Sequence, residues 1–479
     1  MDLEDAIYVQ TTPSSQLLKN YTFFVITMGC AHNQSDSDQI ASFLTSQGAK
    51  ITSYDAANLI YINSCAVKTP SEEKAIFQAT RALDAGKKVV LGGCVSQALK
   101  QIGRLDKYVA DGQCFLSGVI DDKTNQKLIQ QLTGQDVQSI IPKLSEIESK
   151  ISALPSIRFK ENIDIIPICT GCLGNCTYCQ TFHARGKLKS HPKAEVLQRI
   201  QQGLDSDTIT EIWLTGEDTL AWGLDIGSDF AEILAAILAL FEQRNSTKML
   251  RIGMTDPESV IDKAEKLAAV LNHRNVYKFL HLPVQSGSND VLREMRRRYT
   301  VEQYVSLYTS LKALVPALAI ATDFICAFPS ETEEQHQESV RLMDQLNFDI
   351  VNVTQYYPRA NTPAATMTQI QQLVKKQRTG ELARLAVKDF NREQFVGQVH
   401  RVQVLEELQK VFLGRRFAGK LANQITVLIE GGDGQVLQFC VGEEVVLLIV
   451  DVTRVAVVGR FVRREKGVVE RLQAEEVKV

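Results

Sequence analysis

The sequence predicts an α/β protein: an N-terminal parallel α/β domain, a central partial barrel of six β/α units, and a small C-terminal all-β barrel. Between residues 21 and 358, short apolar runs alternate with helical patterns, which is typical of parallel strands covered by helices. After residue 396 short strand-like runs follow one another between turns, as in small closed sheets.

The composition limits the class of protein. At roughly 100–200 residues per domain, a chain of 479 residues suggests about three domains. Hydrophobic residues make up 44% and charged residues 23%, which excludes disorder, collagen and a coiled-coil fibre as the main state. The net charge of −3 excludes a chain that is basic over its whole surface and leaves room for a local basic face.

Neither a targeting nor a membrane signal is evident. The first 20 residues lack a basic segment and an apolar core, so they do not resemble a secretory signal. The nearest candidate for a membrane span, Val445–Val458, is interrupted by Asp451 and Arg454 and predicts strands. We expect a soluble, cytoplasmic protein without a membrane anchor. In a reducing compartment, clustered cysteines are metal ligands more often than disulfides.

The predicted N-terminal domain, residues 20–120, repeats a unit in which an apolar run ends at a cysteine and a helical stretch follows. We expect helices at Asp36–Gln47 and Ser71–Ala85, with Asp36 and Ser71 as their N-caps. Residues 121–162 are more polar and predict a helical connector. The three apolar runs of the domain are Phe23–Cys30, Leu59–Cys65 and Val89–Cys94.

The central barrel is predicted for residues 163–395. Helical patterns at Phe230–Arg244, Glu258–Leu271 and Glu333–Leu346 separate strand-like runs. Six units are fewer than the eight of a closed parallel barrel, so we expect an incomplete one. The six runs are Ile163–Cys169, Glu211–Gly216, Met249–Met254, Lys278–Gln285, Ala319–Phe328 and Ile350–Pro358.

The C-terminal domain is predicted for residues 396–465. Its runs are short and separated by glycine-containing turns, a pattern that indicates a small all-β barrel. The five runs are Gly397–Leu405, Ala422–Ile429, Gln435–Cys440, Glu444–Val450 and Val455–Val462.

Three cysteines lie close together just after the first barrel strand. Cys172, Cys176 and Cys179 share one short loop, at the strand ends where parallel barrels place their active sites. A 4Fe–4S cluster takes one thiolate per iron, so three cysteines leave one iron open for a ligand. Zinc with Cys169 as fourth ligand is the alternative, but paired zinc ligands are usually a dozen or more residues apart. We expect Cys169 to be structural.

A second set of cysteines is far apart in sequence. Cys30, Cys65 and Cys94 each end a predicted strand of the N-terminal domain. Because the carboxyl ends of parallel strands meet at one edge of a sheet, these thiols should converge. They would again leave one iron open. The alternative is three buried core cysteines, which is also our interpretation of Cys114, Cys326 and Cys440.

At this point the sequence resembles a known family. The CxxxCxxC loop is similar to the radical S-adenosylmethionine signature, and the three upstream cysteines make it resemble the methylthiotransferases. Within that family, the motifs look most like the archaeal and eukaryotic N6-threonylcarbamoyladenosine tRNA methylthiotransferases, over about residues 21–462. These motifs are TGCLGNCTYCQTFHARGKLKSHP, EIWLTGED, LHLPVQSGS, ATDFICAFPSET and QYYPRANTPAA. A departure is Ser330, where the family usually has glycine.

The resemblance implies cofactors and their residues. Two [4Fe–4S] clusters are implied, one on Cys172, Cys176 and Cys179 and an auxiliary one on the second set. The open iron of the first would bind S-adenosyl-L-methionine, whose cleavage yields a 5′-deoxyadenosyl radical. Residues implied in cofactor binding are Tyr178, near the adenine; Thr215, Gly216, Glu217 and Asp218, at the methionine amino group; and, more weakly, Arg251 and Gln285.

The resemblance also implies the reaction. The auxiliary cluster would hold the sulfur to be inserted, one S-adenosylmethionine would methylate that sulfur, and a second would generate the radical that removes hydrogen from C2 of adenosine 37 in tRNA. The C-terminal barrel would be a TRAM-like RNA-binding domain. Partners implied are the tRNA anticodon stem-loop, an electron donor and a sulfur source, the last two of unknown identity.

Basic residues suggest where RNA binds. Residues 371–420 hold eleven Lys/Arg and five Asp/Glu, a net +6 in a chain of net −3, which is typical of a phosphate-facing surface. Arg415, Arg416 and Lys420 belong to this segment, and Arg293, Arg296, Arg297 and Arg298 would extend it. Arg185 is a candidate for substrate or phosphate contact because its planar fork suits such groups. The neighbouring His183 is as easily structural.

Two other functions remain open. One is a methylthiotransferase that acts on isopentenyl-adenosine in tRNA or on an aspartate of a ribosomal protein. The other is an iron–sulfur RNA-binding protein without catalysis, against which the complete Cys172–Cys179 loop and Glu217 argue.

Overall fold

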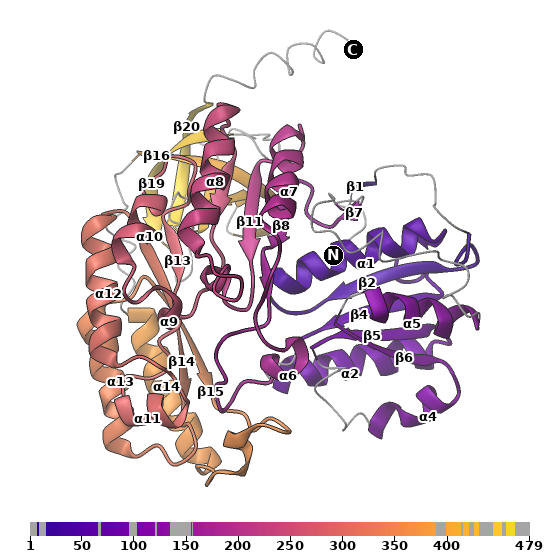
Figure 1. Ribbon diagram of the computed structural model, residues 1–479, viewed down its shortest axis with the longest axis horizontal. Helices are drawn as coiled ribbons and strands as arrows, with labels where there is room; N and C mark the ends of the chain where they lie inside the picture. Colours follow the sequence, from indigo (N-terminus) through magenta and orange to yellow (C-terminus); the bar gives the residue numbers. More distant parts are fainter. Residues whose placement is uncertain are drawn as a thin grey trace.

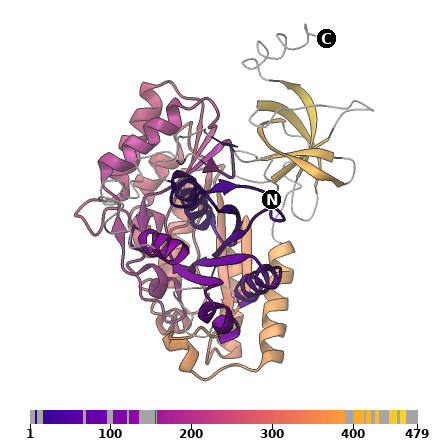
Figure 2. The same cartoon turned by 90° about the vertical axis from the view of Figure 1, so that its right-hand side faces the viewer.

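The computed structural model shows three bodies in one chain (Figure 1). It describes residues 7–8, 16–65, 69–94, 103–119, 122–134, 155, 157–388, 399–412, 415–420, 426–430, 444–452 and 457–464. The N-terminal part and the central part lie side by side, and the C-terminal strands form a separate body beyond the end of helix α14 (Gln372–Lys388), as Figure 2 shows.

The N-terminal part is a five-stranded parallel sheet with the order β3-β2-β4-β5-β6. Every side chain of β4 is buried, as expected for a strand covered on both faces. Helices α1 and α5 pack on the face that carries Leu59 and Tyr61, and α2 packs on the face of Ile60 and Ile62. The strands are β2 (Thr22–Thr27), β3 (Lys50–Ile51), β4 (Leu59–Ser64), β5 (Lys88–Gly93) and β6 (Cys114–Gly118). The helices are α1 (Ala31–Ser46), α2 (Thr69–Asp84), α4 (Asp106–Ala110) and α5 (Asp122–Thr133).

Both N-caps predicted for this domain are wrong. Helix α1 starts at Ala31 with Cys30 as its N-cap residue, so Asp36 lies inside the helix and not at its end. Helix α2 starts at Thr69, two residues before Ser71. Inside α1, the Asp36 carboxylate pairs with Arg185 from the central part.

The six predicted strands of the central part are all present and all parallel. β11 pairs with β8 and β12, and β14 pairs with β13 and β15. A parallel bridge between Leu250 and Val276 connects the two groups of three. The strands are β8 (Ile163–Pro167), β11 (Glu211–Thr215), β12 (Met249–Arg251), β13 (Phe279–His281), β14 (Ala319–Cys326) and β15 (Ile350–Gln355).

Except for the helix at Thr181–Arg185, which packs against the N-terminal part, the helices of the central part cover the outside of this curved sheet (Figure 1). The helices predicted at Phe230–Arg244 and Glu333–Leu346 are confirmed, whereas the stretch Glu258–Leu271 is broken into two helices. They are α6 (Thr181–Arg185), α7 (Lys193–Asp205), α8 (Phe230–Gln243), α9 (Pro257–Val260), α10 (Ala264–Leu271), α11 (Asn289–Glu294), α12 (Val301–Leu314), α13 (Glu333–Leu346) and α14.

Two further ladders are short and antiparallel, and the second of them lies within the central part. β1 (Ile7–Tyr8) pairs with β7 (Ile157–Arg158), and β9 (Cys169–Thr170) pairs with β10 (Lys189–Ser190). Helix α5 confirms a helix at the start of the connector predicted for residues 121–162. Residues 135–154 of that connector lie outside the described residues.

The C-terminal strands close into a five-stranded barrel with the order β16-β17-β18-β20-β19. Four of the five predicted runs fall on β16, β18, β19 and β20, and the run Gln435–Cys440 lies outside the described residues. β17 was not predicted, because its arginines and lysine look like part of a basic surface. The strands are β16 (Val399–Phe412), β17 (Arg415–Lys420), β18 (Thr426–Glu430), β19 (Glu444–Val452) and β20 (Val457–Arg464).

Among the described residues, none of the helices combines the length and the apolar character that crossing a membrane requires.

Candidate functional site

The second set of cysteines lies at the carboxyl edge of the N-terminal sheet. Cys65 and Cys94 directly follow β4 and β5, and Cys30 is the third residue after β2. These three strands are neighbours in the sheet. Cys65 is close enough to act electrostatically on both Cys30 and Cys94. The convergence expected from the strand ends is therefore confirmed.

Two glycines allow the strand ends to approach. A Cβ on Gly29, whose φ is +125°, would lie 3.0 Å from the Cys65 Cβ. A Cβ on Gly93, whose φ is +79°, would lie 2.4 Å from the Ser64 carbonyl oxygen. A larger residue at Gly29 would press on Cys65, and one at Gly93 would press on the backbone of Ser64, the residue before Cys65.

A buried amide pair fixes the same edge. Asn33 Nδ2 donates to Asn63 Oδ1 at 3.0 Å, and Asn63 Nδ2 donates back to the Asn33 carbonyl oxygen at 2.7 Å. The Cys30 thiol donates to Asn33 Oδ1 at 3.4 Å. This pair joins the first turn of α1 to the end of β4 and so sets the position of Cys30 relative to Cys65.

The loop of Cys172, Cys176 and Cys179 lies beyond the carboxyl end of β8. A Cβ on Gly174 would lie 3.6 Å from the Cys172 Sγ and 3.7 Å from the Cys176 Sγ, so both sulfurs lie close to this glycine. Burial raises the pKa of Cys172 and of Cys176, and a neighbouring thiol adds to the shift in each case. Three thiols that lie on one short, partly exposed loop suit a site where a metal cluster replaces their protons.

The spacing of the thiols bears on the metal. Ligands of one tetrahedral zinc, at Zn–S distances of about 2.3 Å, lie less than about 4 Å apart. Among the described residues, neither cysteine set is gathered within 4.8 Å, whereas Glu333, His336 and Glu381 are. Among the described cysteines, neither set therefore has the close spacing that a single zinc ion requires. Cys169 has a separate role, because its thiol donates to the Asp218 carbonyl oxygen at 3.3 Å.

Arg297 contacts the first cysteine set, which sequence reasoning missed. Its Nη1 lies 3.3 Å from the Cys176 Sγ and 2.7 Å from the Asp256 carboxylate, and the side chain is buried. The prediction that Arg297 extends an exposed basic face is therefore wrong. The run of four basic residues gave no signal that one of them turns inward.

Tyr178 lies against an apolar surface. Its ring packs edge-on to Phe328, with centroids 6.4 Å apart, and joins a cluster that includes Met295, Tyr356 and Ala364. An aromatic ring on such a surface suits stacking by a flat heterocycle.

Glu217 and Asp218 at the end of β11 have different partners. Asp218 is fully buried and accepts from the Thr255 and Ser259 hydroxyls and the Asp256 N–H at 2.6–3.0 Å. It therefore braces the turn after β12. Glu217 accepts from the Gly171 N–H at 2.8 Å and so contacts the residue just before Cys172.

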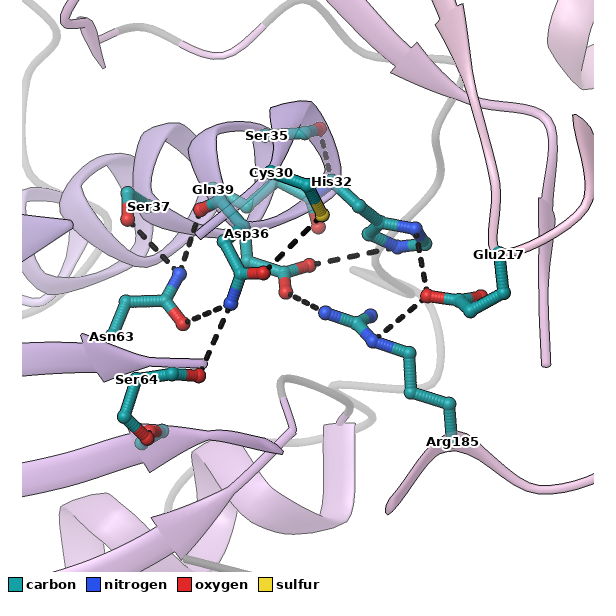
Figure 3. A network of polar contacts seen from close by, with 12 residues as sticks. Cys30, His32, Ser35, Asp36, Ser37, Gln39, Asn63, Ser64, Arg185 and Glu217 are labelled. Carbon is teal, nitrogen blue, oxygen red and sulfur yellow. Dashed lines mark hydrogen bonds and ion pairs between the residues drawn. The ribbon is translucent and has the colours of Figure 1, made fainter. Parts of the chain in front are cut away.

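Glu217 also belongs to a charged network between the two parts (Figure 3). Arg185 on α6 contacts Glu217 at 2.9 Å and Asp36 of α1 at 2.5 Å, while His32 Nδ1 lies 3.1 Å from Glu217. Burial raises the pKa of Glu217, but the charges of His32 and Arg185 outweigh burial and hold that pKa below its ordinary value. Burial raises the pKa of Cys94 to about 12, and Arg185 opposes that shift.

The two weaker candidates for cofactor contact lie inside the barrel. Arg251 is held between the rings of Trp213 and Phe279, at 4.6 and 5.0 Å from their centroids. Gln285 has a φ of 71° and its backbone bridges to Phe324. Arg251 is thus packed between aromatic rings on the strands, whereas Gln285 lies in the loop that follows β13.

The basic segment divides into buried and exposed residues. Lys375 and Arg378 are buried in α14, which corrects their assignment to an RNA face. Arg378 pairs with Glu331 at 2.9 Å. Lys376 and Arg384 are exposed on the same helix. The side chains of Arg415, Arg416 and Lys420 lie outside the described part of the chain, while their backbone forms β17.

Comparison with known proteins assigns the class. Residues 166–343 match the radical SAM superfamily, and residues 22–112 match the uncharacterized protein family UPF0004. The fold and the cysteine loop thus define a radical SAM protein with an N-terminal UPF0004 domain, and membership of the radical SAM superfamily implies a [4Fe–4S] cluster and S-adenosylmethionine. A solved radical SAM methyltransferase, TsrM from Kitasatospora setae, has a TM-score of 0.49 at 14% identity, over 72% of this chain and 76% of that one.

Individual relatives define a narrower family than the superfamily match does. The threonylcarbamoyladenosine tRNA methylthiotransferases of Xenopus laevis and Homo sapiens are 38% and 39% identical over 83% and 80% of this chain. A probable enzyme of this name from Pyrococcus abyssi is 32% identical over 85% of the chain and 88% of its own length. The chain spans 70% of the frog protein and 66% of the human protein. It belongs to the threonylcarbamoyladenosine tRNA methylthiotransferase family.

Proposed function

We propose that the protein inserts a methylthio group at C2 of N6-threonylcarbamoyladenosine 37 in tRNA by radical S-adenosylmethionine chemistry. The observation that carries the proposal is the presence of two cysteine sets at the carboxyl ends of two parallel sheets, joined through Arg185 and Glu217. One set would serve cofactor cleavage and the other would hold the sulfur. The named relatives supply the substrate.

The first set would hold a [4Fe–4S] cluster that, when bound, reduces S-adenosylmethionine to release a carbon radical. The chain's own part is to orient and to exclude water. Glu217 would meet the cofactor's ammonium with a carboxylate held ionised by its neighbours. Tyr178 and its apolar cluster would receive the adenine. Arg297 would neutralise charge at Cys176.

The auxiliary set, Cys30, Cys65 and Cys94, would hold the second [4Fe–4S] cluster and the sulfur to be transferred. Burial raises the pKa of Cys94 to about 12, so a free thiol there stays protonated near neutral pH. Binding of a metal would release that proton. The electron donor and the source of the sulfur would be partners of the enzyme.

RNA would be held by the TRAM-like C-terminal barrel together with exposed basic residues. Small barrels of this kind bind single-stranded nucleic acid along one face. Lys376 and Arg384 lie exposed on α14, which leads toward the barrel. The domain limits that fit this function are 20–120, 121–162, 163–395 and 396–465.

The test is analysis of tRNA nucleosides by mass spectrometry from a strain that lacks the gene, with and without the restored gene. We expect the methylthio form of threonylcarbamoyladenosine to disappear and to return with the intact gene, but not with Cys172→Ala. Loss of methylthio from isopentenyl-adenosine, or from a ribosomal aspartate, would instead assign the alternative substrates.

A second assay separates enzyme from binding protein. Reduced, reconstituted protein incubated with S-adenosylmethionine should release 5′-deoxyadenosine, and the Cys172→Ala protein should not. Absence of 5′-deoxyadenosine from the unsubstituted protein would favour an iron–sulfur protein that only binds RNA.

A further inference from the structure

Two segments of the central part cover the carboxyl edge of the N-terminal sheet, and each carries an arginine. Arg185 ends α6, and Arg359 lies in the loop after β15. Their neighbours Ala184 and Ala360 pack into the N-terminal hydrophobic core that also contains Cys94. Both arginines therefore sit where the three auxiliary cysteines converge.

Each arginine is anchored to an acid of the N-terminal part. Arg185 pairs with Asp36 of α1 at 2.5 Å, and Arg359 Nη1 pairs with Glu72 of α2 at 3.2 Å. The two arginine side chains are only 2% and 5% exposed. Buried ion pairs between parts of a chain fix the geometry of both sides, because separating them leaves an unpaired charge.

Arg359 keeps a donor that the described residues do not satisfy. Its Nη2 is buried and has no hydrogen-bond acceptor among them. Burial lowers the pKa of Arg359, and the nearby Glu72 carboxylate opposes this effect. A buried donor without an acceptor is unfavourable, so this guanidinium is suited to an anion that the described residues do not supply.

A cluster on three thiolates is such an anion. We propose that Arg359 and Arg185 are positioning residues of the auxiliary site: two buried guanidiniums, brought by the central domain, that stabilise the negative charge of the cluster on Cys30, Cys65 and Cys94 and of a sulfide bound to it. The proposal rests on the proposed function for the presence of that cluster. It follows that occupation of the auxiliary site and docking of the two domains are linked, because each strengthens the other.

The same two segments reach the other cysteine loop. The Ala364 N–H, from the Arg359 loop, donates to the Thr177 carbonyl oxygen at 2.9 Å. Arg185 reaches the loop through Glu217, which accepts from the Gly171 N–H. A change at the auxiliary site therefore has a short path of direct contacts to the residues around Cys172 and Cys176.

The first test measures the midpoint potential of the auxiliary cluster in the full-length chain. Cys172, Cys176 and Cys179 are replaced by alanine so that the auxiliary cluster alone gives the electron paramagnetic resonance signal. Arg359→Gln and Arg185→Gln should each shift the potential to more negative values, because loss of a nearby positive charge disfavours the reduced cluster. Arg359→Lys should retain most of the original potential. Arg378→Gln, which removes a buried arginine elsewhere in the central part, should leave it unchanged.

The second test does not require these variants to accept a cluster. Hydrogen exchange of the full-length chain is compared before and after anaerobic reconstitution with iron and sulfide. With Cys172, Cys176 and Cys179 replaced by alanine, segments 181–185 and 359–364 should exchange more slowly after reconstitution, and they should not change when Cys30, Cys65 and Cys94 are alanine as well. Glu72→Gln, which keeps Arg359 but removes its anchor, should reduce the protection.

The proposal would be overturned if neither glutamine variant shifts the midpoint potential of the auxiliary cluster. It would also be overturned if reconstitution leaves the hydrogen exchange of the two segments unchanged. Either result leaves the proposed function intact if the unsubstituted enzyme still forms the methylthio nucleoside. Failure of that reaction with normal potentials and exchange would instead count against the function alone.

Discussion

Ser330 has a left-handed backbone conformation, with a φ of 65°. Its N–H donates to the Thr368 carbonyl oxygen at 3.1 Å, so the turn after Phe-Pro is formed without the usual glycine. A side chain in this conformation costs roughly 1–2 kcal/mol of folded-state stability. A glycine avoids this cost, but its greater freedom in the unfolded chain cancels part of the gain.

We therefore expect Ser330→Gly to raise the free energy of unfolding by about 0.5 kcal/mol. Urea denaturation of the two proteins measures the difference. Ser330→Ala, which keeps the strained conformation, serves as control and should give no gain. A glycine variant less stable than the parent would show that the Ser330 side chain has a stabilising partner.

Asp38 gives a pH dependence. Burial raises the pKa of its carboxyl from 3.8 to about 7. Between these two values the folded state keeps a proton that the unfolded state has lost, so the free energy of unfolding falls as pH rises through that window. Asp38 also accepts from the Phe159 N–H at 3.1 Å, a role that an asparagine oxygen can fill.

We expect the fall in stability between pH 5.5 and pH 8 to be smaller in Asp38→Asn than in the unsubstituted protein. Urea titrations at the two pH values give the comparison. An equal fall in both proteins would mean that Asp38 is already ionised at pH 5.5.

Single residues were predicted best where a strand end fixed them. The positions of Cys30, Cys65 and Cys94 follow from the alternation of runs and helices alone. Arg297 and Arg359 could not be predicted, because nothing local distinguishes a buried arginine from an exposed one. Their roles depend on partners such as Asp256 and Glu72, which lie far away in the sequence.

Among the elements, helix α14 has two faces of different chemistry. Lys375 and Arg378 are buried, whereas Lys376 and Arg384 are exposed. An RNA phosphate can reach only the exposed pair. Log affinity falls as log salt concentration rises, and each phosphate contact that is lost should make this fall less steep by about 0.9 or less.

The double change Lys376→Gln with Arg384→Gln should weaken tRNA binding and reduce its salt dependence. Filter binding at several salt concentrations measures both quantities. Arg274→Gln, an exposed arginine that pairs with Glu242 on α8, is the matched control and should bind as the parent does. Equal binding by all three proteins would show that α14 is not part of the RNA-binding surface.

Elements with a strong period were predicted with good limits, and the others were not. α13 and α8 match their patterns because their apolar spacing is regular. α1 begins before its predicted start because Cys30 takes the cap position. β17 was missed since its sequence, RRFAGK, is basic and has little apolar alternation.

At the scale of the whole molecule, the function depends on how two sheets face each other. Each sheet was predictable from its own sequence. Their relative placement was not, because it rests on buried pairs such as Arg185 with Asp36 that join residues 149 positions apart. Such long-range pairs carry no local pattern.

The central claim is that two separate cysteine sets each hold an iron–sulfur cluster. The most direct measurement is iron and acid-labile sulfide per chain after anaerobic reconstitution, in the unsubstituted protein and in two triple alanine variants. We expect about eight irons in the first and about four in each variant, with cofactor cleavage lost only when Cys172, Cys176 and Cys179 are changed. Full iron in either triple variant, or zinc as the sole metal, would contradict the claim.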